Sequence, residues 1–158
     1  MQMLSATFPD VLASIRTELG PWSELVLRAY AGLVFIPHAL RIGFGYFAAA
    51  DRGPSNMKSF AGQLDRGGYS PGWLWARLIM AVKLVGGPLL AIGLFTQLAA
   101  FSAFCFLAIC NVQRWKVGGF FWDEKGLEYT MMWTLVSLYF AVNGAGVISV
   151  DHFLHIAA

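Results

Sequence analysis

Charged residues are scarce in this sequence, and their scarcity argues against an ordinary soluble domain. Of the 158 residues, 13% are Asp, Glu, Lys or Arg, whereas 58% are hydrophobic. The apolar residues are gathered into four blocks, at residues 24–47, 73–95, 97–115 and 127–147. Roughly 20 mostly apolar residues cross a bilayer, and a helix satisfies all its backbone groups within one such segment. The sequence therefore predicts an all-α integral membrane four-helix bundle, with residues 1–158 as a single membrane domain.

Residue types that bind metals or form disulfides are also few. The chain has two cysteines and three histidines. Cys105 and Cys110 lie five positions apart on one predicted helix, beyond the reach of a disulfide, and we interpret them as small buried hydrophobes. His38 is the one histidine inside the predicted spans, and a single histidine is poor evidence for haem. We expect no metal site, no covalently attached cofactor and, because no basic run is present, no nucleic acid partner.

The segments outside the spans predict shorter helices. Residues 9–19 carry apolar side chains at helical spacing, which predicts an amphipathic helix along the membrane surface; the charges of Asp10, Arg16 and Glu18 argue against a signal peptide. In the first loop, the spacing of Met57, Phe60, Ala61 and Leu64 predicts a second surface helix. At the other end of the chain, Ser149 or Asp151 is placed to cap a short terminal helix.

The distribution of basic residues predicts the orientation of the bundle. Four crossings put both termini on one side of the membrane, and the first and third loops carry most of the basic residues that lie outside the spans. The positive-inside rule then places these loops in the cytoplasm and both termini outside, in the inner (plasma) membrane of a bacterium. The loop charges are Arg52, Lys58, Arg66, Lys116 and Lys125, and Trp73, Trp75, Trp115 and Trp122 are expected to anchor the chain at headgroup level.

Polar side chains converge on the loop-bearing half of the predicted bundle. Lys83 is the deepest charge, and it requires pairing with Glu128, loss of its proton, or contact with a bound anion or polar headgroup. Pro37 and Pro88 each free a backbone carbonyl near these side chains, which favours a polar pocket. The candidate ligand-binding residues are His38, Arg41, Arg77, Lys83, Asn111, Glu128 and Tyr129.

Structural roles are alternatives for most of these residues. Arg41 and Arg77 would serve as interfacial anchors, Glu128 as their counter-ion, and His38 as a packing residue bonded to a neighbouring helix. Glu24 and Arg28, four positions apart in the first span, are interpreted as an interfacial ion pair.

Several motifs occur in an order that resembles a known family. Arg28 precedes a His-Ala-Leu-Arg element at residues 38–41, and a Phe-Ala-Gly-Gln-Leu run at 60–64 precedes Pro71. A Gly-rich segment covers residues 86–96, and the last span runs from Gly-Leu-Glu-Tyr at 126–129 to a Gly-Ala-Gly-Val-Ile-Ser-Val-Asp motif at 144–151. Over residues 24–153 the chain resembles the DoxX family of small four-helix membrane proteins. It departs from the family at Lys83, where relatives commonly carry a glutamate.

The resemblance implies a membrane subunit of a redox system. Some relatives belong to a thiosulfate:quinone oxidoreductase and others associate with redox-defence enzymes, so we expect a quinone-linked accessory subunit whose electrons come from a partner protein. The catalytic residues are not identified by the sequence. The alternatives are a non-catalytic subunit that binds lipid or stabilises a larger membrane complex, and a small oligomeric transporter. Membrane lipid and either a protein partner or a second copy of the chain are the expected partners.

Overall fold

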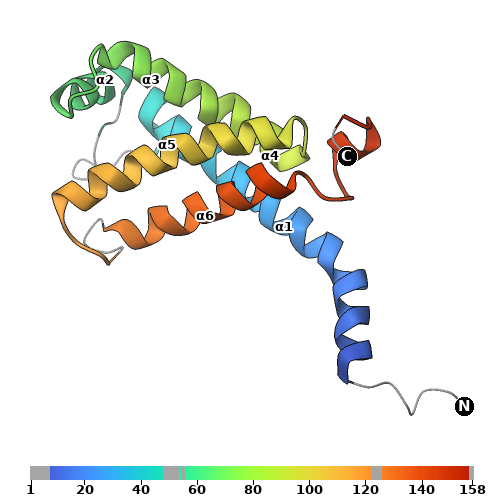
Figure 1. The fold of residues 1–158 in the computed structure, drawn as a ribbon. Coiled ribbons are helices and arrows are strands. Elements are labelled where there is room, and N and C mark those ends of the chain that lie inside the picture. Colours follow the sequence, from blue (N-terminus) through green and yellow to red (C-terminus); the bar gives the residue numbers. More distant parts are fainter. Residues whose placement is uncertain (1–7, 48–53, 55, 122–125, 157–158) are drawn as a thin grey trace, which may run out of the picture.

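The computed structural model describes residues 8–47, 54, 56–121 and 126–156, and every regular element within them is helical (Figure 1). The predicted all-α fold is therefore confirmed. Arg52, Trp122 and Lys125, named above for topology and anchoring, lie outside the described residues. The elements are α1 (Phe8–Phe44), α2 (Met57–Arg66), α3 (Gly72–Ala81), the π-helical segment η1 (Val82–Gly86), α4 (Gly87–Ile92), α5 (Thr96–Val117), α6 (Leu127–Asn143) and α7 (Val150–Phe153).

Three helical stretches of the described chain are long and apolar enough to cross a membrane: α1, the continuous stretch Gly72–Ile92, and Thr96–Lys116. The fourth predicted span corresponds to α6, which has 17 residues and so extends about 25 Å. It ends at Asn143, four residues before the predicted boundary, because Gly144 adopts a φ of 78° that an α-helix does not use. Helix α6 packs along α5 (Figure 1).

Helix α1 is longer than predicted. Residues 9–19 are helical as expected, but they continue directly into the first span and do not form a separate surface helix. Pro21 and Pro37 both lie inside this 37-residue helix. The side chains of residues 8–19 are all exposed, and this N-terminal part of α1 extends away from the bundle (Figure 1).

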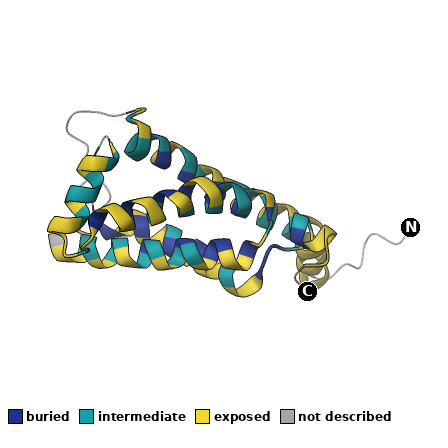
Figure 2. Cartoon of the chain, turned by 90° about the horizontal axis from the view of Figure 1, so that it is seen from above, coloured by how far each residue is buried: buried dark blue, intermediate teal, exposed yellow. Residues whose placement is uncertain are grey.

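The core consists of small and apolar side chains where the helices face one another. Its buried members are Ala31, Phe35, Leu90, Ala99, Ala100, Ala103, Leu107 and Phe140. Figure 2 shows buried positions along the facing sides of the helices and exposed positions on the outside. Many exposed positions carry large apolar side chains, such as Leu98 and Val142. A water-soluble monomer rarely exposes so much apolar surface, so the outer faces of the bundle are suited to lipid.

Helices α1 and α4 approach each other closely through two glycines. A Cβ atom at Gly32 would collide with the carbonyl oxygen of Gly87 and lie 2.5 Å from the amide nitrogen of Ala91. A Cβ atom at Gly87 would lie 2.9 Å from the carbonyl oxygen of Gly32. Small residues that allow close helix contact in membranes are thus used inside this chain at this place.

The predicted helix in the first loop is confirmed as α2, and a carboxylate ties it to α3. Oδ1 of Asp65 accepts hydrogen bonds from the Gly72 backbone N–H (2.7 Å) and from the Ser70 hydroxyl (3.0 Å). The first N–H groups of a helix have no partner within the helix, and Asp65 satisfies one of them at the start of α3. Asp65 thereby holds the turn that leads into the second crossing.

Replacing Asp65 with alanine should destabilise this turn. We expect a loss of about 1 kcal/mol, which is typical for removal of a helix cap, and faster proteolysis between α2 and α3. Arg66→Ala is the matched control, because Arg66 is exposed on the same helix end. Equal proteolysis rates for the two variants would contradict the capping role.

Candidate functional site

Lys83 lies inside the bundle on a distorted turn of the second crossing. In η1 the Gly87 backbone N–H donates to the Val82 carbonyl, five residues back, which widens the helix just before Pro88. Such π-helical turns often occur at functional sites. Lys83 lies about 16 Å from the start of α3 at Gly72, which is near the middle of a bilayer core. Its side chain is 5% exposed.

The Lys83 ammonium faces an aromatic ring. Its Nζ atom lies 4.9 Å from the centroid of the Phe106 ring on α5. A cation over a ring face is stabilised by about 0.5–2 kcal/mol, much less than the cost of removing an isolated charge from water. No ion pair joins Lys83 to Glu128, both of which the structure describes, and Glu128 is exposed at the start of α6.

Basic side chains from three elements lie near His38, which is close to Lys83. Lys83, Arg41 and Arg114 all lie close enough to His38 to act on it electrostatically. Cys110 on α5 is within the same range of Lys83 and Arg114. We call His38, Arg41, Lys83 and Arg114 the basic cluster. His38 is exposed and forms its rim, Arg41 and Arg114 are half-buried, and Lys83 is buried.

Three of the sequence candidates lie apart from the basic cluster. The Arg77 guanidinium is stacked 5.1 Å from the centroid of the Trp73 ring, an arrangement suited to an interfacial anchor. Tyr129 is exposed and contacts the Trp133 ring edge to face. With Glu128, these residues have no described contact with Lys83, so the single pocket predicted from sequence is divided among separate places.

Asn111 joins α5 to α6. Its Nδ2 donates to the Thr134 hydroxyl (2.8 Å), and that hydroxyl donates to the Thr130 carbonyl (2.8 Å). The Asn111 Oδ1 atom is buried and has no hydrogen-bond partner. This side chain is a polar contact between two helices, a common means of association in membranes.

Among the described residues, the most buried charged side chain is that of Arg28, which the sequence predicted to lie at the interface. Arg28 is 1% exposed. Its guanidinium donates to the Ala145 carbonyl and to the Ile148 carbonyl (2.8 Å), and Asp151 and Glu24 both act on it electrostatically. The signal was present in the sequence, because Arg28 precedes the buried Ala31, Gly32 and Phe35 by three, four and seven positions.

Asp151, in the C-terminal segment near Arg28, bonds to the turn before α5. Its two carboxylate oxygens accept hydrogen bonds from the backbone N–H groups of Phe95 (2.7 Å) and Thr96 (2.8 Å), at the start of α5. The Asp151 backbone N–H donates to the Gly93 carbonyl (2.8 Å). Ser149, as predicted, caps α7 by accepting from the His152 backbone N–H. Arg28 and Asp151 thus fasten the C-terminal segment to α1 and to the turn before α5.

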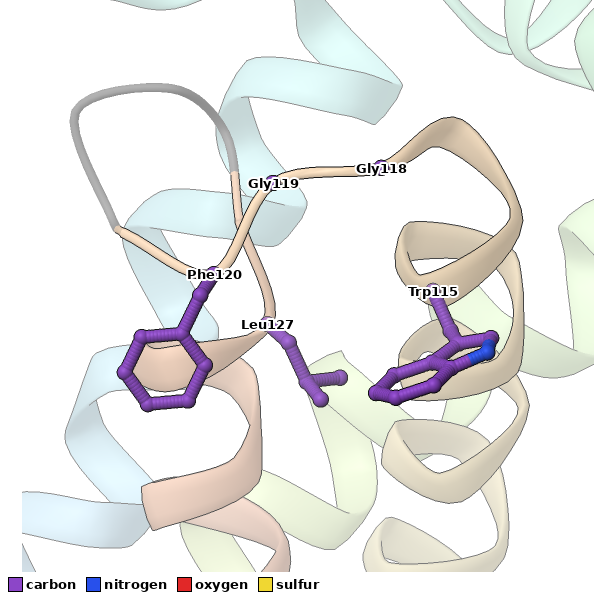
Figure 3. A pocket seen from close by; sticks show the side chains of 5 residues that line it. All are labelled: Trp115, Gly118, Gly119, Phe120 and Leu127. Carbon is purple, nitrogen blue, oxygen red and sulfur yellow. The ribbon is translucent and has the colours of Figure 1, made fainter.

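An apolar hollow of about 270 Å³ lies at the other end of α5, where the chain turns toward α6. Trp115, Gly118, Gly119, Phe120 and Leu127 line it (Figure 3). The Trp115 ring and the Leu127 side chain point toward the same space in this view. Trp115 is 74% exposed, as expected for an aromatic anchor at a membrane surface.

The comparisons with known proteins give one match. The chain matches none of the curated proteins and none of the solved structures. The family model described as DoxX matches residues 23–112, which is more than half of the chain. The matched residues include His38, Arg41 and Lys83 of the basic cluster, and they end before Arg114 and before α6. The chain therefore belongs to the DoxX family of integral membrane proteins.

Proposed function

We propose that the chain is the membrane subunit of a quinone-linked redox system, and that the basic cluster binds the quinone head group. The observation that supports this most directly is Lys83, a hydrogen-bond donor that is 5% exposed, lies over the Phe106 ring and has no carboxylate partner among the described residues. Quinone carbonyl oxygens are hydrogen-bond acceptors, and ammonium and imidazole N–H groups are donors. The residues present therefore fit a quinone ring.

Two residues of the basic cluster, Lys83 and His38, have distinct roles in this proposal. A bound quinone supplies two-electron transfer coupled to protons. Lys83 Nζ donates a hydrogen bond to one carbonyl oxygen and fixes the orientation of the ring. The imidazole of His38, at the exposed rim, is placed to accept a proton or to donate an N–H to a carbonyl oxygen. The electrons come from a partner redox protein.

The proposal includes an orientation. The basic cluster lies at the end of α1 and α5 that leads into the two basic loops. By the positive-inside rule this end faces the cytoplasm of a bacterium, with both termini on the outer side of the inner membrane. The electron donor would then dock on the cytoplasmic side.

Retention of native quinone tests the proposal. The chain, purified in gentle detergent, should carry close to stoichiometric quinone, measured by solvent extraction and chromatography. Lys83→Met should retain at least about tenfold less, because a charge-assisted hydrogen bond is lost while a flexible apolar side chain of nearly the same length remains. Lys58→Met, on exposed α2, and Glu128→Gln should retain as much as the unchanged protein.

Two results would contradict the quinone site. One is the absence of quinone from the unchanged protein, even when native lipid is retained. The other is equal retention by Lys83→Met and Lys58→Met. A thermal unfolding curve for each variant identifies any loss of quinone that follows from loss of the fold.

The second candidate is a non-catalytic subunit that binds lipid and stabilises a larger complex. The apolar hollow beside Trp115 favours it, because a cavity of this kind accommodates part of an acyl chain. Phospholipid at constant stoichiometry, without quinone or a redox partner, would favour this candidate. The close packing of Gly32 against α4 weakens it, since that small-residue surface is already occupied within the chain.

A further inference from the structure

The two buried cationic side chains of the described residues, Arg28 and Lys83, have different surroundings. Arg28 lies between two carboxylates, Asp151 and Glu24, and donates to two backbone carbonyls. Lys83 has a ring face and the Cys110 thiol in its surroundings. Both side chains are at least nine-tenths buried. Among the described residues, two carboxylates therefore act on Arg28, whereas none acts on Lys83.

The described charged groups at the rim have the same sign as Lys83. The residues that act electrostatically on His38 are Lys83, Arg41 and Arg114, all of them basic. Arg41 and Arg114 make further contacts of their own, so the buried charge without a described counter-ion is that of Lys83. A buried charge without a counter-ion is costly, and an anion placed beside it is strongly attracted.

We infer that the ligand of the basic cluster carries a negatively charged oxygen. Lys83 supplies the compensating charge near mid-membrane, with His38 at the rim. The ligand class is a lipophilic acid: a ring or chain soluble in the bilayer that bears an ionised hydroxyl or a carboxylate. Where the ligand is a quinone, this inference rests on the proposed function. It then restricts the expected quinones to those with an ionised acidic group.

A matched pair of ligands tests the inference. Lawsone is a naphthoquinone whose ring hydroxyl is ionised at neutral pH, and lawsone methyl ether is its neutral analogue. We expect the purified protein to bind lawsone about tenfold more tightly than the ether, measured by equilibrium dialysis. Lys83→Met should remove the preference, whereas Lys83→Arg, which keeps the charge, and the surface control Lys58→Met should retain it.

Equal affinity for lawsone and its ether would overturn the inference and leave the quinone proposal standing. If neither naphthoquinone binds, the quinone proposal fails, and dodecanoate is then compared with methyl dodecanoate. Tighter binding of dodecanoate that depends on Lys83 supports an anion site for a lipid-derived acid. Equal binding of these two, or no binding of either, overturns the inference as well. Displacement of lawsone by inorganic phosphate would support a site for an anionic oxygen. It would also indicate that the natural ligand is a water-soluble anion.

Discussion

Replacing Arg28 with alanine should unfold the C-terminal segment from the bundle and cause the largest stability loss of any charge substitution in this chain. The change leaves the carbonyls of Ala145 and Ile148 without their donor. It also removes the positive charge on which Asp151 and Glu24 act. Removal of one partner from a buried ionic group typically costs about 3–5 kcal/mol. Thermal unfolding in detergent, followed by size-exclusion chromatography, would measure the effect.

The variant Arg28→Lys separates the contribution of the guanidinium geometry to stability from that of the positive charge. Lysine keeps the charge but lacks the planar fork that reaches two carbonyls, so we expect an intermediate loss. Arg16→Ala, an exposed arginine in the same helix, is the control and should leave the unfolding temperature unchanged. An Arg28→Ala protein as stable as the Arg16→Ala protein would refute the role of Arg28 in holding the C-terminal segment.

Replacing Gly32 with alanine should separate α1 from α4. The added Cβ atom would meet the carbonyl oxygen of Gly87 and the amide nitrogen of Ala91, which are backbone atoms of a packed helix and cannot rotate away. Overpacking a core costs about 1–3 kcal/mol, and a backbone collision belongs at or beyond the upper end of this range. We expect reduced expression, a lower unfolding temperature and easier proteolysis.

Gly20→Ala is the matched control for Gly32→Ala. Gly20 lies in the same helix, and a Cβ atom there would have nothing within 4 Å. Alanine is a better helix former than glycine by about 1 kcal/mol, so this variant should be as stable as the unchanged protein or slightly more stable. If the two variants unfold at the same temperature, the close approach of α1 and α4 is not essential to the fold.

The helices were predictable because lipid imposes a simple rule. A long apolar block within a bilayer must be helical, so composition alone located the α3–α4 crossing, α5, α6 and the C-terminal end of α1 to within a few residues. The helix α2 was predictable from its spacing. Two predicted boundaries were wrong. Residues 9–19 are continuous with the rest of α1, and α6 ends before Gly144, earlier than predicted.

The candidate site was predictable in its types of residue and less so in its grouping. Lys83 was identified as the deepest charge because depth follows from counting residues. Pairing with Glu128 was one of three alternatives predicted for Lys83, and the structure shows no contact between these two residues, since the rotation of each helix about its axis cannot be read from a hydropathy block. Because helix rotation could not be predicted, Arg28 was interpreted as facing the interface. In the structure it faces Gly93 and the C-terminal segment.

By itself the sequence determined that the chain is an all-α membrane protein of the DoxX family, because apolar length and motif order are properties of local sequence. The tertiary structure decided which charges meet. It placed Arg28 near Asp151, which lies 123 positions later in the chain, and it placed Lys83 over the Phe106 ring and near His38. The physical reason is that pairing depends on helix rotation and close approach, and both are set by packing between segments far apart in the sequence.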